Sequence, residues 1–227
     1  MTAEIWVSSV MGDSSIGNKQ GIREKYLGED WAPPEFTFGP TSEKALHTLR
    51  KHNAGEKLAR SDLTEAMYVF SESHWRRVGD LFTAGGFYAV KGKLATVLGR
   101  FDLGGGELIE LPIYQPDKTT RLTGPFYLLN FGAQKDSFLP AASRDVHPFF
   151  TMELDGREVW KANIKPADYD IAVSKAALNA ADIWFESRLK DKIFMSGRLH
   201  DAIVEAKIRT DFRFSRARII SRDAGLH

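Results

Sequence analysis

One short stretch carries a serine, a histidine and an aspartate, the residue types of a hydrolytic triad. Ser196 precedes His200 by four residues, and Asp201 follows directly. Nucleophilic catalysis needs the serine bonded to the histidine, and the histidine held by the acid. On a helix, Ser196 as the N-cap uses its oxygen on backbone amides, and Asp201 points about 100° away from His200. We therefore expect no catalytic residues in this trio, and a protein that is not an enzyme.

Metal, cofactor and phosphate sites are not indicated. Of the six histidines, His47 and His52 lie five residues apart, on different faces of a helix, which argues against a shared metal. The chain has no cysteine, which excludes disulfides and thiolate-bound metals. It also has no phosphate-binding loop, nucleophile elbow or HExxH sequence, and Gly104–Gly106 is typical of a turn. We expect no metal and no cofactor.

An acidic group near the N-terminus is a candidate for binding a partner. Glu29 and Asp30 stand directly before Trp31 and a proline stretch. Tryptophan is enriched at the centres of protein interfaces, so Trp31 could anchor an acidic contact loop. The alternative is a solvated acidic loop. Glu29, Asp30 and Trp31 are the partner-binding residues that the sequence predicts.

A basic cluster near the C-terminus suggests polyanion binding. It comprises Lys207, Arg209, Arg213, Arg216, Arg218 and Arg222. The cations could follow a phosphate backbone while Phe212 and Phe214 stack on bases. In a strand, however, alternation would place those phenylalanines on the opposite face, towards the core. With a formal net charge of only +1, the chain has no global attraction for polyanions, and we do not expect it to bind nucleic acid.

Two copies of one motif supply the elements that would position these residues. They are YVFSESHWRRVGDLFTAGGF, Tyr68–Phe87, and IFMSGRLHDAIVEAKIRTDF, Ile193–Phe212. In each copy an apolar strand leads to a serine, Ser71 or Ser196, that is a good helix N-cap. Apolar spacing predicts a first helix that includes Val78, Leu81 and Phe82, closed by two glycines.

The remaining pattern consists mostly of strands. The sequence predicts strands at Leu94–Leu98, Leu108–Tyr114, Phe126–Phe131 and Ile208–Phe214, and a hairpin of Phe149–Leu154 with Glu158–Ala162 around Asp155-Gly156. Short helices are expected from Thr41 or Ser42, from Ser61 or Asp62, and at Ala176–Ala180. The Met1–Phe38 segment reads as a short strand, Glu4–Val10, followed by a polar loop, and as an entry region rather than a core. These expectations give an α+β fold: mixed, mostly antiparallel sheets with a few short helices and two strand-serine-helix units.

Composition indicates a globular protein of the cytoplasm. The chain has 227 residues, 43% hydrophobic and 27% charged, which suits one domain in one or two lobes. Its N-terminus lacks a cationic region and an apolar run of signal-peptide length. No apolar run approaches the roughly 20 residues of a membrane span. We expect no membrane partner.

Four segments follow one another in a suggestive order. They are YVFSESHW, GPFYLLNF (Gly124–Phe131), DYDIAVSKAAL (Asp168–Leu178) and IFMSGRLHDAI (Ile193–Ile203). Together they resemble a bacterial immunity-protein family of polymorphic toxin systems, formerly a domain of unknown function and first named after a myxobacterial member. The family's strand-to-serine steps, central strand and aromatic pair fit Phe70-Ser71, Tyr127–Asn130, Trp184-Phe185 and Met195-Ser196. The resemblance covers about Tyr68–Phe214, roughly two thirds of the chain.

This resemblance implies a cytosolic inhibitor of a cognate toxin, such as one delivered by a type VI secretion apparatus. Residues 67–220 would form the immunity-type domain, residues 1–66 a variable region packed on it, and residues 221–227 a loose tail. The inhibitor would occlude the toxin's active site through aromatic anchors and a charged rim. Two alternatives stay open: a small hydrolase-like enzyme that uses His74 or His200, and a nucleic-acid-binding module that uses the C-terminal arginines.

Overall fold

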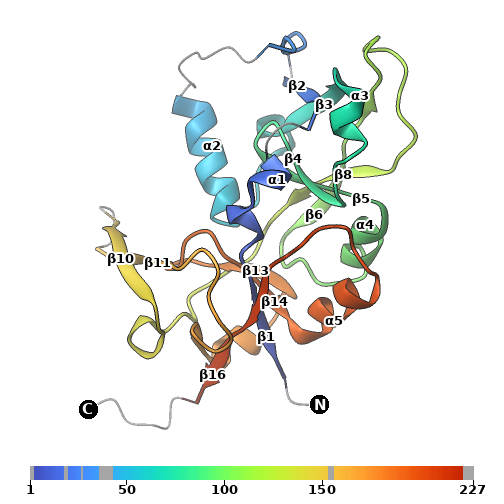
Figure 1. Ribbon diagram of the computed structural model, residues 1–227. Coiled ribbons are helices and arrows are strands. Elements are labelled where there is room, and N and C mark those ends of the chain that lie inside the picture. The colour runs from blue at the N-terminus through green and yellow to red at the C-terminus, as the bar shows by residue number, and fades with distance from the viewer. Residues whose placement is uncertain (1–2, 18–19, 27, 36–42, 153–155, 222–227) are drawn as a thin grey trace.

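The computed structural model describes residues 3–17, 20–26, 28–35, 43–152 and 156–221. Its fold is α+β with mixed, mostly antiparallel sheets, as the sequence predicts (Figure 1). The largest sheet has the strand order β15-β1-β14-β13-β9. Its strands are β15 (Phe214–Arg216), β1 (Ile5–Ser8), β14 (Ile193–Ser196), β13 (Ile183–Glu186) and β9 (Gln134–Lys135). Only the pairing of β13 with β9 is parallel.

The N-terminal strand β1 lies inside this sheet, between β14 and β15. Its Ile5 and Val7 are at most 1% exposed and belong to the core. The expectation that the opening segment is an entry region is therefore wrong for β1.

The expected boundary after Ala66 falls inside β3 (Thr64–Val69). β3 pairs on one side with β2 (Ile22–Tyr26) and on the other with β7 (Ile113–Tyr114).

A second large sheet has four antiparallel strands. Its order is β4-β5-β8-β6, with bounds β4 (Leu81–Ala84), β5 (Phe87–Lys91), β8 (Phe126–Asn130) and β6 (Glu107–Glu110). Gly85 and Gly86 join β4 to β5 with φ of +60° and +89°, values that glycine adopts readily. The expected helix through Leu81 and Phe82 is wrong, because these residues pair in β4 with β5.

Two smaller sheets complete the strands. β10 (Val146–Thr151) and β11 (Glu158–Ala162) form an antiparallel ribbon, which confirms the hairpin expected around Asp155-Gly156. Of that turn, Asp155 lies outside the described residues. β12 (Ala172–Ser174) pairs in parallel with β16 (Arg218–Ile220). The expected final strand is largely wrong, because β15 begins only at Phe214 and the preceding residues form a loop that buries Phe212.

The helices are short. Their bounds are α1 (Ser14–Gly17), α2 (Glu43–Asn53), α3 (Glu72–Trp75), α4 (Gly92–Leu98) and α5 (Gly197–Glu205). Four 3₁₀ turns add η1 (Val10–Gly12), η2 (Arg60–Asp62), η3 (Pro140–Ala142) and η4 (Lys175–Leu178). The turn η4 confirms the short helical turn expected near Ala176, while η2 replaces the helix expected from Ser61 or Asp62. The expected caps of α2, Thr41 and Ser42, lie outside the described residues.

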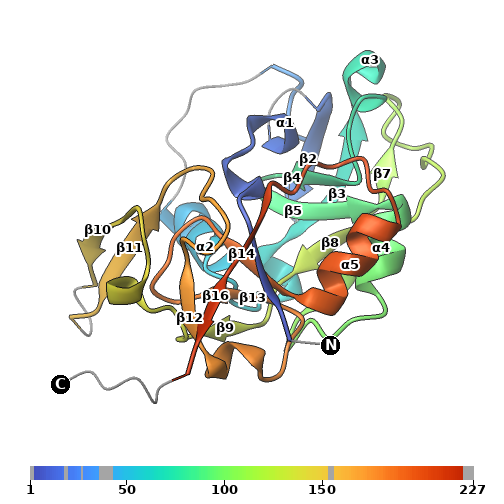
Figure 2. The same cartoon turned by 60° about the horizontal axis from the view of Figure 1, so that its bottom comes forward.

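Helices α4 and α5 lie side by side and cover one end of the core (Figure 2). Leu94 and Leu98 of α4 are buried with Leu199 and Ile203 of α5 in one cluster. Each such side chain contributes about 1.5–3 kcal/mol on burial. The strand expected over Leu94–Leu98 is thus wrong, since a short apolar run suits a buried helix face equally well.

Candidate functional site

An open recess of about 590 Å³ lies where β13, β14 and the start of α5 meet. Most of its lining residues are apolar, and several of them, including Ala177, Ala181 and Gly197, are small. The charged residues Asp182, Arg198, Asp201 and Glu4 also line it. A concave site with a few polar groups is the usual form of a ligand site, so its polar groups are the first candidates for chemistry.

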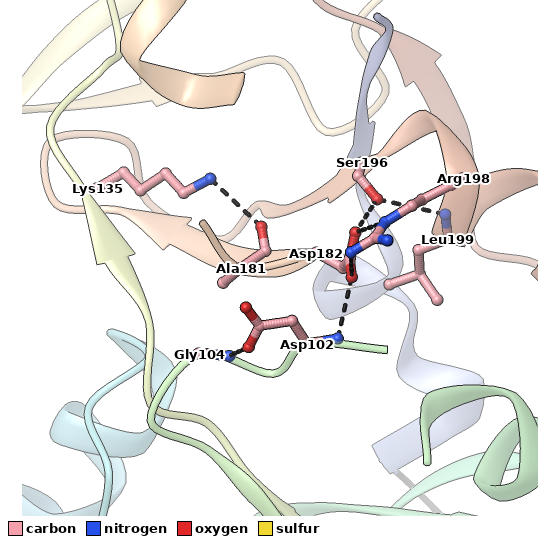
Figure 3. Close-up of polar contacts among 8 residues, drawn as sticks. All are labelled: Asp102, Gly104, Lys135, Ala181, Asp182, Ser196, Arg198 and Leu199. Atoms are coloured by element: carbon pink, nitrogen blue, oxygen red, sulfur yellow. Dashed lines mark hydrogen bonds and ion pairs between the residues drawn. The ribbon is translucent and has the colours of Figure 1, made fainter. Parts of the chain in front are cut away.

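Asp182 lies at the centre of these polar groups (Figure 3). Its side chain is 2% exposed and sits just before β13. Arg198 holds it through Nε and Nη2, each at 2.5 Å, and Ser196 Oγ donates to it at 2.5 Å. The backbone amide of Asp102 donates to Oδ2 at 2.9 Å. Four donors thus converge on one carboxylate from two separate segments, the loop at Asp102 and the junction of β14 with α5.

The bonds keep Asp182 charged and leave it little capacity to react. Burial alone would raise the pKa of this carboxyl, but hydrogen bonds from Arg198, Ser196 and the Asp102 amide outweigh it, and the pKa lies below its ordinary value. A carboxylate has about four lone-pair sites, and four donors use them. Asp182 therefore joins the 102 loop, β13, β14 and α5, and it is poorly suited to act as a general base.

The expected trio near the recess is only partly assembled. Ser196 caps α5 by accepting from the Leu199 amide at 3.3 Å, as expected, and its proton goes to Asp182. His200 Nδ1 lies 2.9 Å from Asp201 Oδ1, so the expectation that Asp201 points away from His200 is wrong. The His200 ring stacks on Trp6 with centroids 3.6 Å apart. Ser196 serves as the cap that the sequence predicts and also as a donor to Asp182, which the sequence does not predict.

Lys135 borders the same region and is held in place. Its Nζ donates to the carbonyl oxygens of Ala177 at 2.8 Å and Ala181 at 3.3 Å, and lies 3.5 Å from the Trp184 ring centroid. Burial lowers the pKa of Lys135 to about 8, although Glu186, Asp182 and Asp102 act in the opposite direction. The ammonium group therefore connects β9 to the segment before β13 through hydrogen bonds.

The other serine of the repeated motif forms a different contact. Ser71 occupies the N-cap position of α3, but its side chain makes no capping bond, so the expected cap is wrong. Its Oγ lies instead 2.7 Å from His74 Nδ1. Neither residue lines the Asp182 recess. A hydrolase would need His74 oriented by a further group, and no acid is bonded to it among the described residues.

The predicted partner-binding residues lie on a loop after β2. Glu29 and Asp30 are exposed. Trp31 is half-buried, with its ring edge-on to Tyr68 at 5.4 Å and Tyr114 at 5.6 Å. The carboxylates are thus at the surface while the indole packs within the molecule, and their contact with a partner stays a prediction.

The side chains of three of the C-terminal arginines form contacts within the chain. Arg213 pairs with Asp13 at 3.1 Å, and Arg216 lies 3.8 Å from Glu4 and over the Trp6 ring. Arg218 donates to the Ala142 carbonyl. Arg222 lies outside the described residues. These contacts favour a structural role for the cluster.

A second candidate surface, which sequence reasoning missed, lies on the β10–β11 ribbon. Phe149 is 52% exposed and Phe150 43%, and they are neighbours in the chain. Successive side chains of a regular strand point to opposite faces. Here a bulge between Pro148 and Phe150 interrupts the pairing, and the two rings lie edge to face with centroids 5.5 Å apart. The bulge thus gathers two aromatic rings into one exposed pair.

A groove of about 400 Å³ opens between this ribbon and α2. The ribbon contributes Phe150, Met152 and Val159, while α2 contributes Arg50 and Lys51. Figure 1 shows α2 and the ribbon on the same side of the molecule. Apolar patches of this kind mark interaction surfaces more often than isolated exposed residues do.

In the part of the chain that the structure describes, no group of three or more histidine or acidic side chains is arranged to hold a metal ion. No helix among the same residues has the length and apolar character to cross a bilayer.

No model of a known protein family matches the sequence, and no curated protein matches it either.

Proposed function

We propose that this chain is an immunity protein, which binds a cognate bacterial toxin in the cytoplasm and neutralises it by covering its active site. The toxin would belong to a polymorphic system, such as one delivered by type VI secretion. The observation that carries the proposal is the exposed Phe149–Phe150 pair on the ribbon. Aromatic side chains exposed together are typical anchors of protein interfaces.

The chemistry of the recess supports a binding role over a catalytic one. Its buried carboxylate, Asp182, is saturated by donors, and Ser196 is committed to Asp182 and to the α5 amide. Catalysis needs a nucleophile or a base whose lone pair is available to a substrate in the pocket. Asp182, Ser196 and Arg198 therefore have a structural role in this recess, since their hydrogen bonds hold neighbouring segments together.

The segments that carry the family resemblance form the framework behind the ribbon. Phe70-Ser71 joins β3 to α3, Tyr127–Asn130 lies in β8, Trp184-Phe185 lies in β13, and Met195-Ser196 joins β14 to α5. These segments are mostly buried, and the ribbon is not among them. Within the proposal, the framework is the shared part and the exposed surfaces select the toxin.

Co-expression tests the proposal. The chain is produced with the toxin domain encoded by the adjacent gene, with cell survival and co-purification as readouts. We expect a stable complex and surviving cells. A toxin that kills equally with and without the chain, and fails to co-purify with it, would contradict the proposal.

A further inference from the structure

The groove between α2 and the ribbon carries a charge pattern that goes beyond its apolar lining. Arg50 and Lys51 of α2 and Lys190 beyond β13 line it. No carboxylate lies within ion-pair distance of these three side chains in the part of the chain that the structure describes. The groove therefore presents three cations that have no acidic partner among the described residues.

The carboxylates that line the groove do not neutralise these cations. Glu186 is 3% exposed and accepts from the Ser137 amide and hydroxyl, the Phe138 amide and the Trp184 indole. Asp191 lies 3.8 Å from Lys161. Glu56 is exposed and is the one other carboxylate of the lining, against Arg50, Lys51 and Lys190; Arg157 lines the groove as well. The unpaired charge of the groove is positive.

The end of helix α2 gives an alternative role for its cations, because basic residues stabilise the negative end of a helix. Here that end is already bonded. The amide of Ala54 donates to the carbonyl of Arg50, that of Gly55 to His52 and that of Glu56 to Lys51, each at 3.0 Å. Gln134 Nε2 donates to the Ala54 carbonyl at 2.8 Å. The side chains of Arg50 and Lys51 are thus not needed to satisfy these carbonyl groups.

The apolar part of the groove fixes a second requirement on the occupant. Phe150, Met152 and Val159 line one wall, and Lys190 Nζ lies 5.7 Å from the Phe150 ring centroid. An occupant must place an apolar side chain against this wall and acids towards α2. Strand addition along β10 is disfavoured, because Pro148 and the bulge blunt that edge.

We infer that the groove binds an acidic segment of the partner protein, with carboxylates towards Arg50, Lys51 and Lys190 and an aromatic or aliphatic side chain on the ribbon. This inference rests on the proposed function for the identity of the partner, the toxin. The toxin would present carboxylates and an apolar side chain to the groove. Complementary charge at such a rim chiefly raises the association rate and selects the partner.

Labelled peptides test the groove without the toxin. The probes are GDEFDEG, its basic counterpart GKKFKKG, and GDEGDEG, which lacks the aromatic ring, titrated by fluorescence anisotropy at low and high salt. GDEFDEG is expected to bind best and to weaken as salt rises. The double variant Arg50→Glu/Lys51→Glu is expected to bind it at least about tenfold more weakly, since each exposed ion pair contributes up to about 1 kcal/mol.

The matched control is Lys165→Glu/Lys175→Glu, which makes the same charge change at exposed residues outside the groove. Arg50→Gln/Lys51→Gln, expected to weaken binding less, guards against loss of the helix, and circular dichroism checks folding. Equal binding of the acidic and basic peptides, or equal weakening by the control, would overturn the inference.

The toxin from the adjacent gene separates this inference from the proposed function. If the toxin binds the wild type and the Arg50→Glu/Lys51→Glu variant alike, and GDEFDEG does not bind, the groove inference fails while the function stands. If GDEFDEG binds in the groove and the toxin does not bind at all, the function fails and the groove remains a site for acidic segments.

Discussion

At the scale of single residues, Asp182 and His52 are both buried, yet their surroundings favour opposite charge states. Asp182 has four donors and stays ionised. His52 is fully buried among the rings of Phe87, Tyr88 and Phe131. Its Nε2 accepts from the Tyr88 amide at 2.9 Å, and its Nδ1 has no hydrogen-bond partner among the described residues. The imidazole is therefore held neutral.

Asp182→Asn should lower the free energy of unfolding by about 2 kcal/mol, because a charge-assisted network on a buried group is broken. Asp201→Asn, on the exposed side of α5, should cost less than about 1 kcal/mol. Urea unfolding of both variants measures the difference. Equal costs would mean that Asp182 does not join the segments as described.

His52 should make stability depend on acid. Burial lowers its pKa from 6.5 to about 4. Between these values the unfolded chain binds a proton that the folded chain does not, so stability falls as pH drops from 6.5 and levels off below about 4. The full effect is about 3 kcal/mol at roughly 1.4 kcal/mol per pKa unit.

Urea unfolding between about pH 7 and pH 5 tests this dependence. His52→Gln should lose stability less steeply with falling pH than the wild type, whereas His47→Gln, at an exposed position, should follow the wild type. Parallel curves for the wild type and His52→Gln would show that His52 is not held neutral.

At the scale of elements, the two strand-serine-helix units are less alike than their sequences. The second has a nine-residue helix, α5, with a bonded cap. The first has a four-residue helix, α3, whose serine bonds to His74. The repeat in sequence therefore predicts the strand-to-helix step at both sites but not the length of the helix.

The two serines should differ when they are removed. Ser196→Ala should cost about 1–2 kcal/mol, because α5 loses its cap and Asp182 loses a donor. Ser71→Ala should stay within about 0.5 kcal/mol, as expected of a surface change. Thermal and urea unfolding of the two variants give the comparison, and a larger loss for Ser71→Ala would reverse the assignment.

Local patterns explain which elements were predictable. The Asp155-Gly156 signature and the aliphatic run before Ser196 correctly predicted the β10–β11 ribbon and β14. The run at Leu94–Leu98 was too short to separate a helix from a strand. The spacing of Leu81 and Phe82 fitted a helix, but pairing with β5, a tertiary effect, made them a strand.

The candidate surfaces were harder to predict than the elements. The donors to Asp182 come from residues 102, 196 and 198, so no local motif marks the site. Its one signal is an acid beside the apolar run of β13. For Phe149 and Phe150 the sequence predicts only an ordinary strand, because the bulge that brings the two rings together depends on pairing with β11.

At the scale of the whole molecule, the segments that resemble the family are mostly buried, whereas the candidate binding surface is exposed. The family-like segments lie in β3, β8, β13 and β14 and are mostly buried, and α4 and α5 lie side by side over one end of the core (Figure 2). The ribbon, by contrast, exposes every residue from His147 to Thr151. A protein arranged in this way can vary its surface residues with little effect on its core.

The most direct test of the proposed function measures toxin binding when the aromatic pair is removed. Phe149→Ser/Phe150→Ser is compared with the wild type and with Leu46→Ser/Val204→Ser, which changes two exposed apolar residues elsewhere. Calorimetric titration against the toxin domain of the adjacent gene gives the affinities. The account predicts that the ribbon variant stays folded and binds at least about 100-fold more weakly, since interface anchors contribute about 2 kcal/mol or more each, while the control binds like the wild type. Unchanged affinity in a folded ribbon variant would contradict it.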